Sequence, residues 1–284
     1  MTTTKTLSNN IKESDIISLA IITLILIMIL SDLISIFHST TSWVFHFGAI
    51  LLIPLLIAYS ASIYGIKFLS KFFITFFFGG LAIELLGTRT GIPFGAYKYT
   101  SKFQPQILGI PIQIPLGWFS LGIMSYSITY FTRFTKTNKI ITSSLLMLMW
   151  DVLYDPIFTA YKIWIWKEGE YFNIPLTNFL GWFLTSLLFF TIVEFKTNHE
   201  TNDRKSITKT APILIYIAYA FDGGIQNIIL NQPLASVIGT SFMILTLLIT
   251  LLKGSILQTS KTNDKIHHIS SLYWKKRKIR VKKN

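Results

Sequence analysis

The stretch Trp150-Asp-Val-Leu-Tyr-Asp-Pro156 closes a run of apolar residues, beginning at Ile140, that is long enough to cross a lipid bilayer. Its two carboxyl groups, Asp151 and Asp155, are four residues apart and therefore fall on one face of a helix. An ionisable side chain at membrane depth is costly, so such residues usually face a cavity or a partner and mark function. The stretch predicts a helical membrane bundle that surrounds this acidic pair.

The composition of the chain fits a multi-pass membrane protein. Of its 284 residues, 51% are hydrophobic and 14% are charged, whereas soluble chains carry about 25% charged residues. The net charge is +13, but the basic residues cluster between and after the apolar segments, which fits membrane topology better than nucleic-acid binding. The absence of cysteine excludes disulfides, thiolate catalysis and cysteine-ligated metals. The histidines show no metal-ligand spacing, so we expect no metal site.

Eight apolar segments predict an all-α integral membrane bundle of about eight transmembrane helices. In chain order they are 16–37, 43–62, 72–86, 117–130, 140–160, 176–193, 211–230 and 234–252. We expect a polar tail at 1–15, a transmembrane catalytic domain at 16–252 and a basic tail at 253–284. The connection 87–115 is too apolar for a solvated linker, so it should lie in the interface or re-enter the bundle.

The distribution of Lys and Arg predicts the orientation of the bundle in the cell membrane. The two tails and the loops on their side hold 21 of these residues, and the opposite side holds 5. The positive-inside rule then places both termini in the cytoplasm and both long aromatic loops outside. In this topology several carboxyl groups converge on the outer leaflet: Asp32, Glu84, Asp151, Asp155 and Asp222. Alternatively, some of them only cap helices or pair with basic residues of the outer loops.

Two ten-residue segments resemble each other. Ile110-Pro-Ile-Gln-Ile-Pro-Leu-Gly-Trp-Phe119 matches Ile174-Pro-Leu-Thr-Asn-Phe-Leu-Gly-Trp-Phe183 at six positions. Both segments enter a helix after an outer loop, and both follow a helix that ends in acidic residues. The bundle could therefore contain repeated helical hairpins with the site at their junction. The alternative is that helix starts at the interface simply favour Pro, Gly and Trp.

Four blocks of sequence together resemble the membrane carotenoid-biosynthesis family that includes the carotenoid 1,2-hydratases and the bisanhydrobacterioruberin hydratases. The blocks are Glu84–Tyr99, Ile110–Trp118, Asp151–Pro156 and the segment from Trp164 to Trp182. Asn173 departs from the pattern, because family members often carry Gly there. The resemblance implies the addition of water to terminal isopropylidene double bonds of a C40–C50 carotenoid in a bacterioruberin-type pathway. It implies no cofactor.

The acidic pair suits this chemistry. Hydration of a trisubstituted alkene needs a proton on the less substituted carbon, stabilisation of the tertiary cation, and then water. Burial and a neighbouring carboxylate both keep a carboxylic acid protonated near neutral pH, and Asp151 and Asp155 supply both conditions. We expect Asp155 to donate the proton and Asp151 to be the ionised partner. Pro156 disfavours helix at the preceding residue, so the backbone is expected to open there.

Further side chains complete the predicted site. Glu84 joins the acidic pair as a catalytic candidate, and Arg89 and Asn178 are expected to position water. The aromatic faces that could stabilise the cation are Trp118, Tyr154, Trp166, Tyr171 and Trp182. Tyr97, Tyr99 and Asp222 complete the substrate-binding candidates. Anchoring at the membrane interface is the alternative role of the aromatic residues.

Two other functions remain open from the sequence. An intramembrane prenyltransferase could bind magnesium and diphosphate through the Asp-x-x-x-Asp pattern, with Asp222 as the nearest candidate for the second acidic cluster that such enzymes need. A proton-coupled transporter could use the buried carboxyl groups. The expected partners are a lipid-soluble carotenoid, membrane lipids, which the basic tail could contact, and other membrane enzymes of the carotenoid pathway.

Overall fold

The structure is a computed structural model that describes residues 13–38, 43–132, 134–195, 197 and 206–254. Within these helices, the side chains of residues 31–33, 35–38, 43–49, 206 and 207 lie outside the description. Asp32, which the sequence places with the acidic group, is one of them. The basic tail beyond residue 254 also lies outside the described residues.

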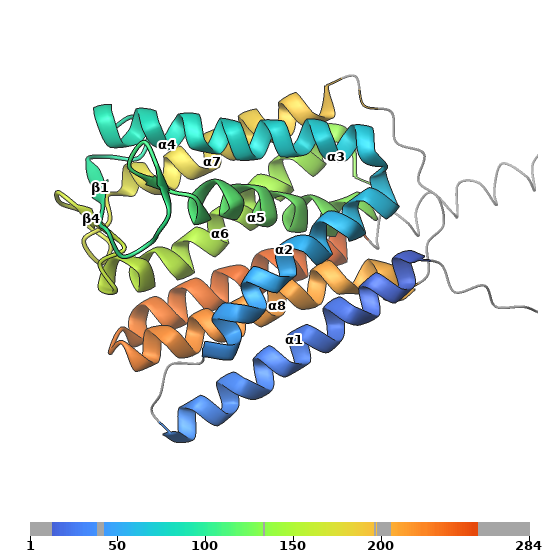
Figure 1. The fold of residues 1–284 in the computed structure, drawn as a ribbon, viewed down its shortest axis with the longest axis horizontal. Coiled ribbons are helices and arrows are strands. Elements are labelled where there is room, and N and C mark those ends of the chain that lie inside the picture. The colour runs from blue at the N-terminus through green and yellow to red at the C-terminus, as the bar shows by residue number, and fades with distance from the viewer. Residues whose placement is uncertain (1–12, 39–42, 133, 196, 198–205, 255–284) are drawn as a thin grey trace, which may run out of the picture.

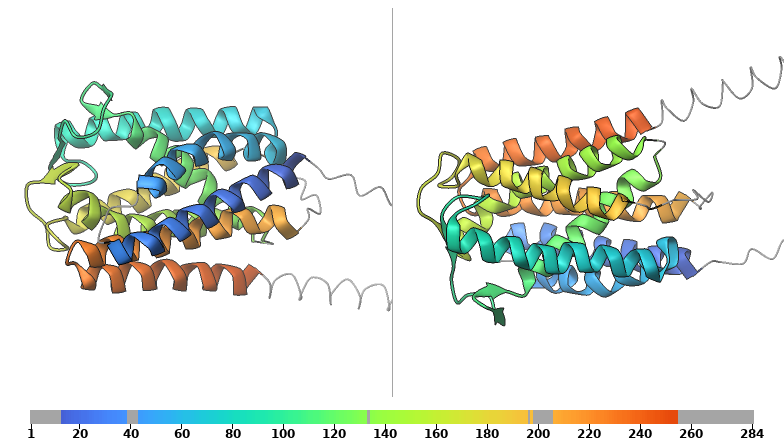
Figure 2. Two further views of the ribbon diagram at one scale, coloured as in Figure 1. Left: turned by 60° about the horizontal axis from the view of Figure 1, so that its bottom comes forward. Right: turned by 90° about the horizontal axis from the view of Figure 1, so that it is seen from above.

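Helices dominate the described chain and run roughly alongside one another along its longest axis (Figure 1). They are α1 (Glu13–His38), α2 (Trp43–Tyr64), α3 (Ile66–Phe73), α4 (Gly79–Thr90), α5 (Gln113–Tyr130), α6 (Lys136–Ala160), α7 (Leu176–Glu194), α8 (Ser206–Ile229) and the helix Pro233–Gly254. One π-helical turn, η1 (Ile74–Phe78), joins α3 to α4. The start of α1 and the end of the helix Pro233–Gly254 lie at the same end of the bundle, opposite the strands (Figures 1 and 2).

Within the described residues, six helical segments are long and apolar enough to cross a membrane. They are Glu13–Leu30, Ile66–Thr90, Lys136–Ala160, Leu176–Glu194, Thr208–Ile229 and Pro233–Gly254. The described apolar part of α2, Ile50–Tyr64, is shorter. Most side chains of α5 are buried, and a helix covered by protein does not need a continuous apolar surface. The prediction of a helical membrane bundle is confirmed, whereas the number of eight spans stays a prediction.

Two segments that the sequence places between apolar spans are partly helical in the structure. Lys67 and Lys71 lie in α3, and α6 begins at Lys136 instead of residue 140. The ammonium group of Lys71 donates to the carbonyls of Val193 (2.9 Å) and Phe195 (2.6 Å) at the end of α7. A long basic side chain can thus belong to a membrane helix when its charge reaches the unpaired carbonyls that end a neighbouring helix.

The expectation that Pro156 opens the backbone at Asp155 is wrong, because α6 continues to Ala160. Proline in a helix removes the hydrogen bond to the carbonyl four residues earlier, which here belongs to Val152. The hydroxyl of Tyr171 donates to that carbonyl at 3.4 Å. A side chain from the following loop therefore compensates part of the lost hydrogen bond.

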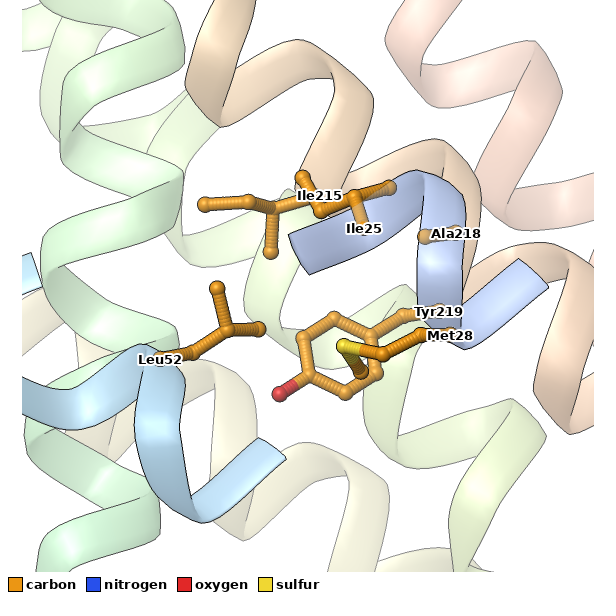
Figure 3. Close-up of a pocket in the computed structure, with 6 residues that line it drawn as sticks. All are labelled: Ile25, Met28, Leu52, Ile215, Ala218 and Tyr219. Atoms are coloured by element: carbon orange, nitrogen blue, oxygen red, sulfur yellow. The ribbon is translucent and has the colours of Figure 1, made fainter. Parts of the chain in front are cut away.

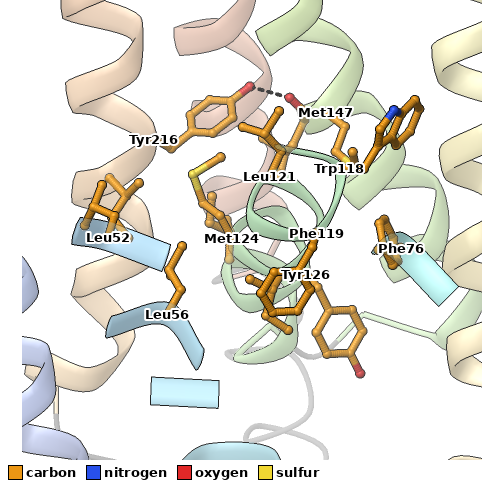
Figure 4. Close-up of a cluster of buried hydrophobic side chains, with 14 of the residues drawn as sticks. Leu52, Leu56, Phe76, Trp118, Phe119, Leu121, Met124, Tyr126, Met147 and Tyr216 are labelled. Carbon is orange, nitrogen blue, oxygen red and sulfur yellow. Dashed lines mark hydrogen bonds between the residues drawn. The ribbon is translucent and has the colours of Figure 1, made fainter. Parts of the chain in front are cut away.

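The core is rich in aromatic side chains and depends on close helix approaches. Phe72 and Phe76 stack at 4.3 Å, and a Cβ on Gly122 of α5 would lie 2.5 Å from the ring of Phe76. Figure 4 shows apolar side chains of α5 between those of neighbouring helices. The Tyr216 hydroxyl of α8 donates to the Leu146 carbonyl of α6 at 3.0 Å. Small residues let membrane helices approach closely, and these contacts hold α5 against η1 and α8 against α6.

Two long loops meet at one end of the bundle through short strands. The strand β1 (Tyr97–Tyr99) pairs antiparallel with β4 (Trp164–Trp166), so that Tyr97 lies opposite Trp166 and Tyr99 opposite Trp164. A second ribbon joins β2 (Gln106–Ile107) to β3 (Ile110–Pro111). The sequence predicted aromatic loops in these two segments but not the short strands within them. Their pairing brings aromatic side chains from the two loops over the ends of α4 and α6.

Candidate active site

The two carboxyl groups of α6 share one hydrogen-bond donor. Asp151 and Asp155 are 2% and 1% exposed, and they lie on the same face of the helix, as their spacing predicts. The amide nitrogen of Asn178, in the first turn of α7, donates to Asp151 Oδ2 at 2.9 Å and to Asp155 Oδ2 at 2.7 Å. Two anions so close together in an apolar bundle would be costly, so the arrangement favours one shared proton between them.

The hydrogen bonds distinguish the two carboxyl groups. Asp155 Oδ1 accepts from the indole of Trp164 at 2.7 Å and from the hydroxyl of Thr159 at 3.5 Å. Asp155 therefore has donors at both oxygens. Among the described residues, the Asp151 carboxyl accepts a hydrogen bond only at Oδ2, from the amide of Asn178. Because donors stabilise a carboxylate more than a carboxylic acid, the shared negative charge is favoured on Asp155.

Glu84, near the end of α4, forms a second buried carboxyl centre. Its Oε1 accepts from the indole of Trp118 at 2.9 Å, and its Oε2 accepts from the hydroxyls of Tyr97 and Tyr99, the latter at 2.7 Å. Burial, and next the nearby Glu84 carboxylate, raise the pKa of Tyr97 and of Tyr99 well above the ordinary value for a phenol. Both phenols therefore stay protonated and act as neutral donors to Glu84.

Aromatic rings beside the two carboxyl centres pack against each other. The ring of Tyr97 lies 4.8 Å from that of Trp166, and the ring of Tyr99 lies 5.9 Å from that of Trp164. Deeper in the bundle, Trp118 of α5 stacks on Trp182 of α7 at 4.1 Å. The β1–β4 pairing and this stack therefore hold Glu84 and the acidic pair in one aromatic-lined region.

Asp222 and Tyr154 belong to a neighbouring group instead. The hydroxyl of Tyr154 donates to Asp222 Oδ2 at 2.7 Å and to the carbonyl of Tyr219 at 3.0 Å. The Gln226 amide donates to Asp222 Oδ1 at 3.4 Å. Tyr154 also stacks on Trp150 at 4.3 Å. These hydrogen bonds join α6 to α8.

The remaining candidates differ in position. Arg89 is exposed in the last turn of α4, so its predicted role in positioning water has no support from the contacts of Glu84, whose partners are neutral. Tyr171 is partly buried and donates to the Val152 carbonyl. Burial, and next the Asp155 carboxyl, raise the pKa of Tyr171 to about 12.

The site residues predicted from the sequence did not include Trp164 and Thr159, which both donate to Asp155 Oδ1. The alternating Trp164-Ile165-Trp166 was a strand-like signal that places both indoles on one side.

Another buried acid lies outside the predicted group. Glu194, at the end of α7, is 3% exposed and accepts from the hydroxyl of Tyr126 at 2.7 Å. The ammonium group of the buried Lys139 donates to the carbonyl of Tyr130 at 3.4 Å and lies 5.4 Å from the centre of its ring. α7 runs from Asn178 in its first turn to Glu194 at its last residue, so this acid lies far from the acidic pair and does not join it.

A narrow apolar crevice lies between α1, α2 and α8 (Figure 3). It is lined by Ile25, Met28, Leu52, Ile215, Ala218 and Tyr219. This lining contains no carboxyl group, so the crevice offers no acid–base chemistry. In the part of the chain that the structure covers, no group of three or more His, Cys, Asp and Glu side chains could hold a metal ion.

We expect Tyr97→Phe to destabilise the protein through Glu84. The change removes one of three donors to a buried carboxylate, and a hydrogen bond to a charged group contributes about 1.5–3 kcal/mol. The measurement is the midpoint of thermal unfolding in detergent, compared with Tyr171→Phe, whose hydroxyl makes one long hydrogen bond of 3.4 Å. Equal midpoints for the two variants would contradict the importance of this donor.

We expect Gly169→Ala to displace the loop that carries the indoles. A Cβ at Gly169 would lie 2.1 Å from the carbonyl carbon of Ile174 and 2.3 Å from the nitrogen of Pro175, and both are backbone atoms. Gly117→Ala is the matched control, because its Cβ would meet no atom within 4 Å. Quenching of tryptophan fluorescence by acrylamide should increase in Gly169→Ala and stay unchanged in Gly117→Ala; the same quenching in both variants would contradict the predicted clash.

The sequence pattern of the family described as "Carotenoid biosynthesis protein" matches residues 44–248. The chain belongs to this family. A curated relative, named bisanhydrobacterioruberin hydratase, from Haloarcula japonica, is 30% identical over 118 residues, which are 40% of this chain and 40% of the relative. No solved structure matches the chain. The family resemblance and the membrane character expected from the sequence are thus confirmed, and a role in carotenoid biosynthesis follows.

Proposed function

We propose that the protein is a cofactor-independent hydratase that adds water to terminal isopropylidene double bonds of a C40–C50 carotenoid. The observation that carries this proposal is the buried pair Asp151 and Asp155, bridged by one amide and lined by aromatic rings. Membership of a carotenoid-biosynthesis family and the name of the relative support it. The chain spans only 40% of that relative, so its substrate is a proposal and not a transferred property.

The hydrogen bonds favour Asp151 as the acid and Asp155 as the base, which reverses the assignment expected from the sequence. In the first step the O–H bond of Asp151 breaks and its proton forms a C–H bond at the less substituted alkene carbon. This step leaves a tertiary cation and the Asp151 carboxylate. Water then forms the C–O bond as it passes a proton to the Asp155 carboxylate. Return of one proton from Asp155 to Asp151 restores the site.

Aromatic rings around the pair suit a cationic intermediate. Trp166 and Tyr97 pack against each other beside Asp155, and Trp118 and Trp182 form the stack nearby. The faces of such rings attract positive charge. We propose that they stabilise the tertiary cation while the apolar bundle excludes bulk water. The polyene itself would enter from the lipid, where a hydrocarbon of this length resides.

The direct test is expression in a bacterial host that makes lycopene or its prenylated C50 derivative. Extracted pigments would be compared by chromatography and mass spectrometry with those of a host that carries the Asp151→Asn, Asp155→Asn double variant. The proposal predicts a product heavier by one or two waters with an unchanged chromophore. An unchanged pigment pool, with the protein present in the membrane, would contradict it. A product enlarged by a prenyl unit would favour the prenyltransferase instead.

We also propose that the protein lies in the cell membrane with both termini in the cytoplasm. Because the chain has no cysteine, single cysteines can report the orientation without background. Ser101 lies in the aromatic loop after β1, and Thr137 lies in the first turn of α6; both are exposed. We expect a membrane-impermeant maleimide to label Ser101→Cys in intact cells, and Thr137→Cys only after permeabilisation. The opposite labelling pattern would contradict the proposed orientation.

A further inference from the structure

The indole N–H of Trp166 is buried without an acceptor. Trp166 is 9% exposed, and within the described part of the chain its Nε1 has no hydrogen-bond partner. The other indole on the same strand, that of Trp164, donates to Asp155 Oδ1 at 2.7 Å. A buried donor without an acceptor costs free energy, and each such group in a folded protein calls for an explanation.

The position of Trp166 is fixed by the strand that carries it. Residue 166 pairs with residue 97 in the β1–β4 ribbon, and the two rings pack at 4.8 Å. Trp164 and Trp166 are two residues apart on β4, so both indoles project from the same side of the strand. The Trp166 N–H also lies near the Asp155 carboxyl and acts on it as a weak donor, although it does not meet the geometry of a regular hydrogen bond. This N–H, which makes no regular hydrogen bond, is therefore held beside the carboxyl group that we assign as the base.

We propose that Trp166 Nε1 binds the oxygen of the water that attacks the cation and holds this water against Asp155. This inference rests on the proposed hydratase function and adds a water-binding residue to it. Water accepts the indole N–H with one lone pair and donates one hydrogen to the Asp155 carboxylate. Its second lone pair is then free to bond to the cationic carbon. The N–H of Trp164 cannot bind this water, because it already donates to Asp155 Oδ1.

The cation can either bind water or lose a proton, and the ratio of these two outcomes tests the water-binding role of Trp166. In D₂O, Asp151 delivers a deuteron to the alkene. The cation then either gains water to give the alcohol, or loses a proton to the Asp151 carboxylate to return an alkene that keeps deuterium. Trp166→Phe removes the N–H but keeps an aromatic ring, so it should weaken the capture of water more than the formation of the cation. We expect the ratio of deuterated alkene to alcohol, measured by mass spectrometry, to rise about tenfold.

Trp150→Phe is the matched control. Trp150 also has a buried Nε1 without a hydrogen-bond partner among the described residues. Its ring lies 4.3 Å from Tyr154 and 6.4 Å from Trp182, and within the described residues it has no ring contact with Trp166 or Tyr97. The inference predicts a ratio in Trp150→Phe equal to that of the unmodified protein. An unchanged ratio in Trp166→Phe, or an equal rise in both variants, would overturn it. Failure of the hydratase proposal itself would look different, because the unmodified protein would then form no alcohol.

A second variant covers the case in which Trp166→Phe does not accumulate in the membrane. Benzothienylalanine at position 166 keeps the bicyclic ring and replaces only the N–H with sulfur. The packing against Tyr97 is then preserved. The same rise in the ratio of deuterated alkene to alcohol supports the water-binding role, and an unchanged ratio overturns it.

Discussion

Asp151→Asn should lower the rate of carotenoid hydration by at least about a thousandfold, within the range that a positioned acid contributes to catalysis. The amide keeps the size of the side chain but has no acidic proton to deliver. Because the reaction stops before the cation forms, deuterium exchange into the alkene should be lost together with the alcohol. The measurement is the yield of both products per amount of protein extracted from the membrane.

Asp155→Asn gives the internal comparison for this prediction. If Asp155 is the base, its loss should reduce the alcohol while deuterium exchange persists, since Asp151 can still protonate the alkene. Exchange that survives in Asp151→Asn and disappears in Asp155→Asn would contradict the assignment and restore Asp155 as the proton donor. Full hydration activity in both variants would remove the acidic pair from the mechanism.

Asn178→Leu is expected to have the second-largest effect. Leucine has a similar size but removes the one amide nitrogen that donates to both Asp151 and Asp155. The charge shared by the pair would lose its common donor, and the two carboxyl groups would no longer be held in a fixed arrangement. We expect hydration to fall about a hundredfold, since misplacement of catalytic groups is costly, and stability to fall by about 3 kcal/mol.

Thr185→Val is the matched control for this change. Thr185 is buried on the same helix, two turns after Asn178. We assign it no hydrogen bond to Asp151 or Asp155. The initial hydration rate and the thermal midpoint in detergent should both stay close to those of the unmodified protein. A drop in hydration as large in Thr185→Val as in Asn178→Leu would show that any change in this part of α7 disturbs the site.

The grouping of Asp151 and Asp155 in the candidate site could be predicted from the sequence because its signals are local. The spacing of Asp151 and Asp155 within an apolar run requires a shared helix face at membrane depth, and the structure has that face. Asn178 was included through the family resemblance, and it is the residue that bridges the pair. The acidic pair follows from the geometry of one helix, whereas the bridge from Asn178 depends on the packing of α7 against α6.

What the sequence missed depends on contacts between distant segments. The β1–β4 ribbon joins loops more than sixty residues apart, so its pairing leaves no periodic signal. Trp164 is a donor to Asp155 only because of that pairing. The continuity of α6 at Pro156 likewise depends on Tyr171, which reaches the Val152 carbonyl from another loop. The stacking of Trp118 on Trp182 places the two similar segments against each other, but the duplication itself stays a prediction.

The central claim is that an oxygen from water becomes the tertiary hydroxyl of a carotenoid end group. The most direct measurement uses the purified protein in detergent, a carotenoid with isopropylidene ends, and water enriched in oxygen-18, with product masses determined after extraction. Our account predicts one heavy oxygen for each hydrated end, formed without added metal, nucleotide or redox cofactor. An alcohol without the heavy isotope, or an unaltered carotenoid in the presence of folded protein, would contradict it.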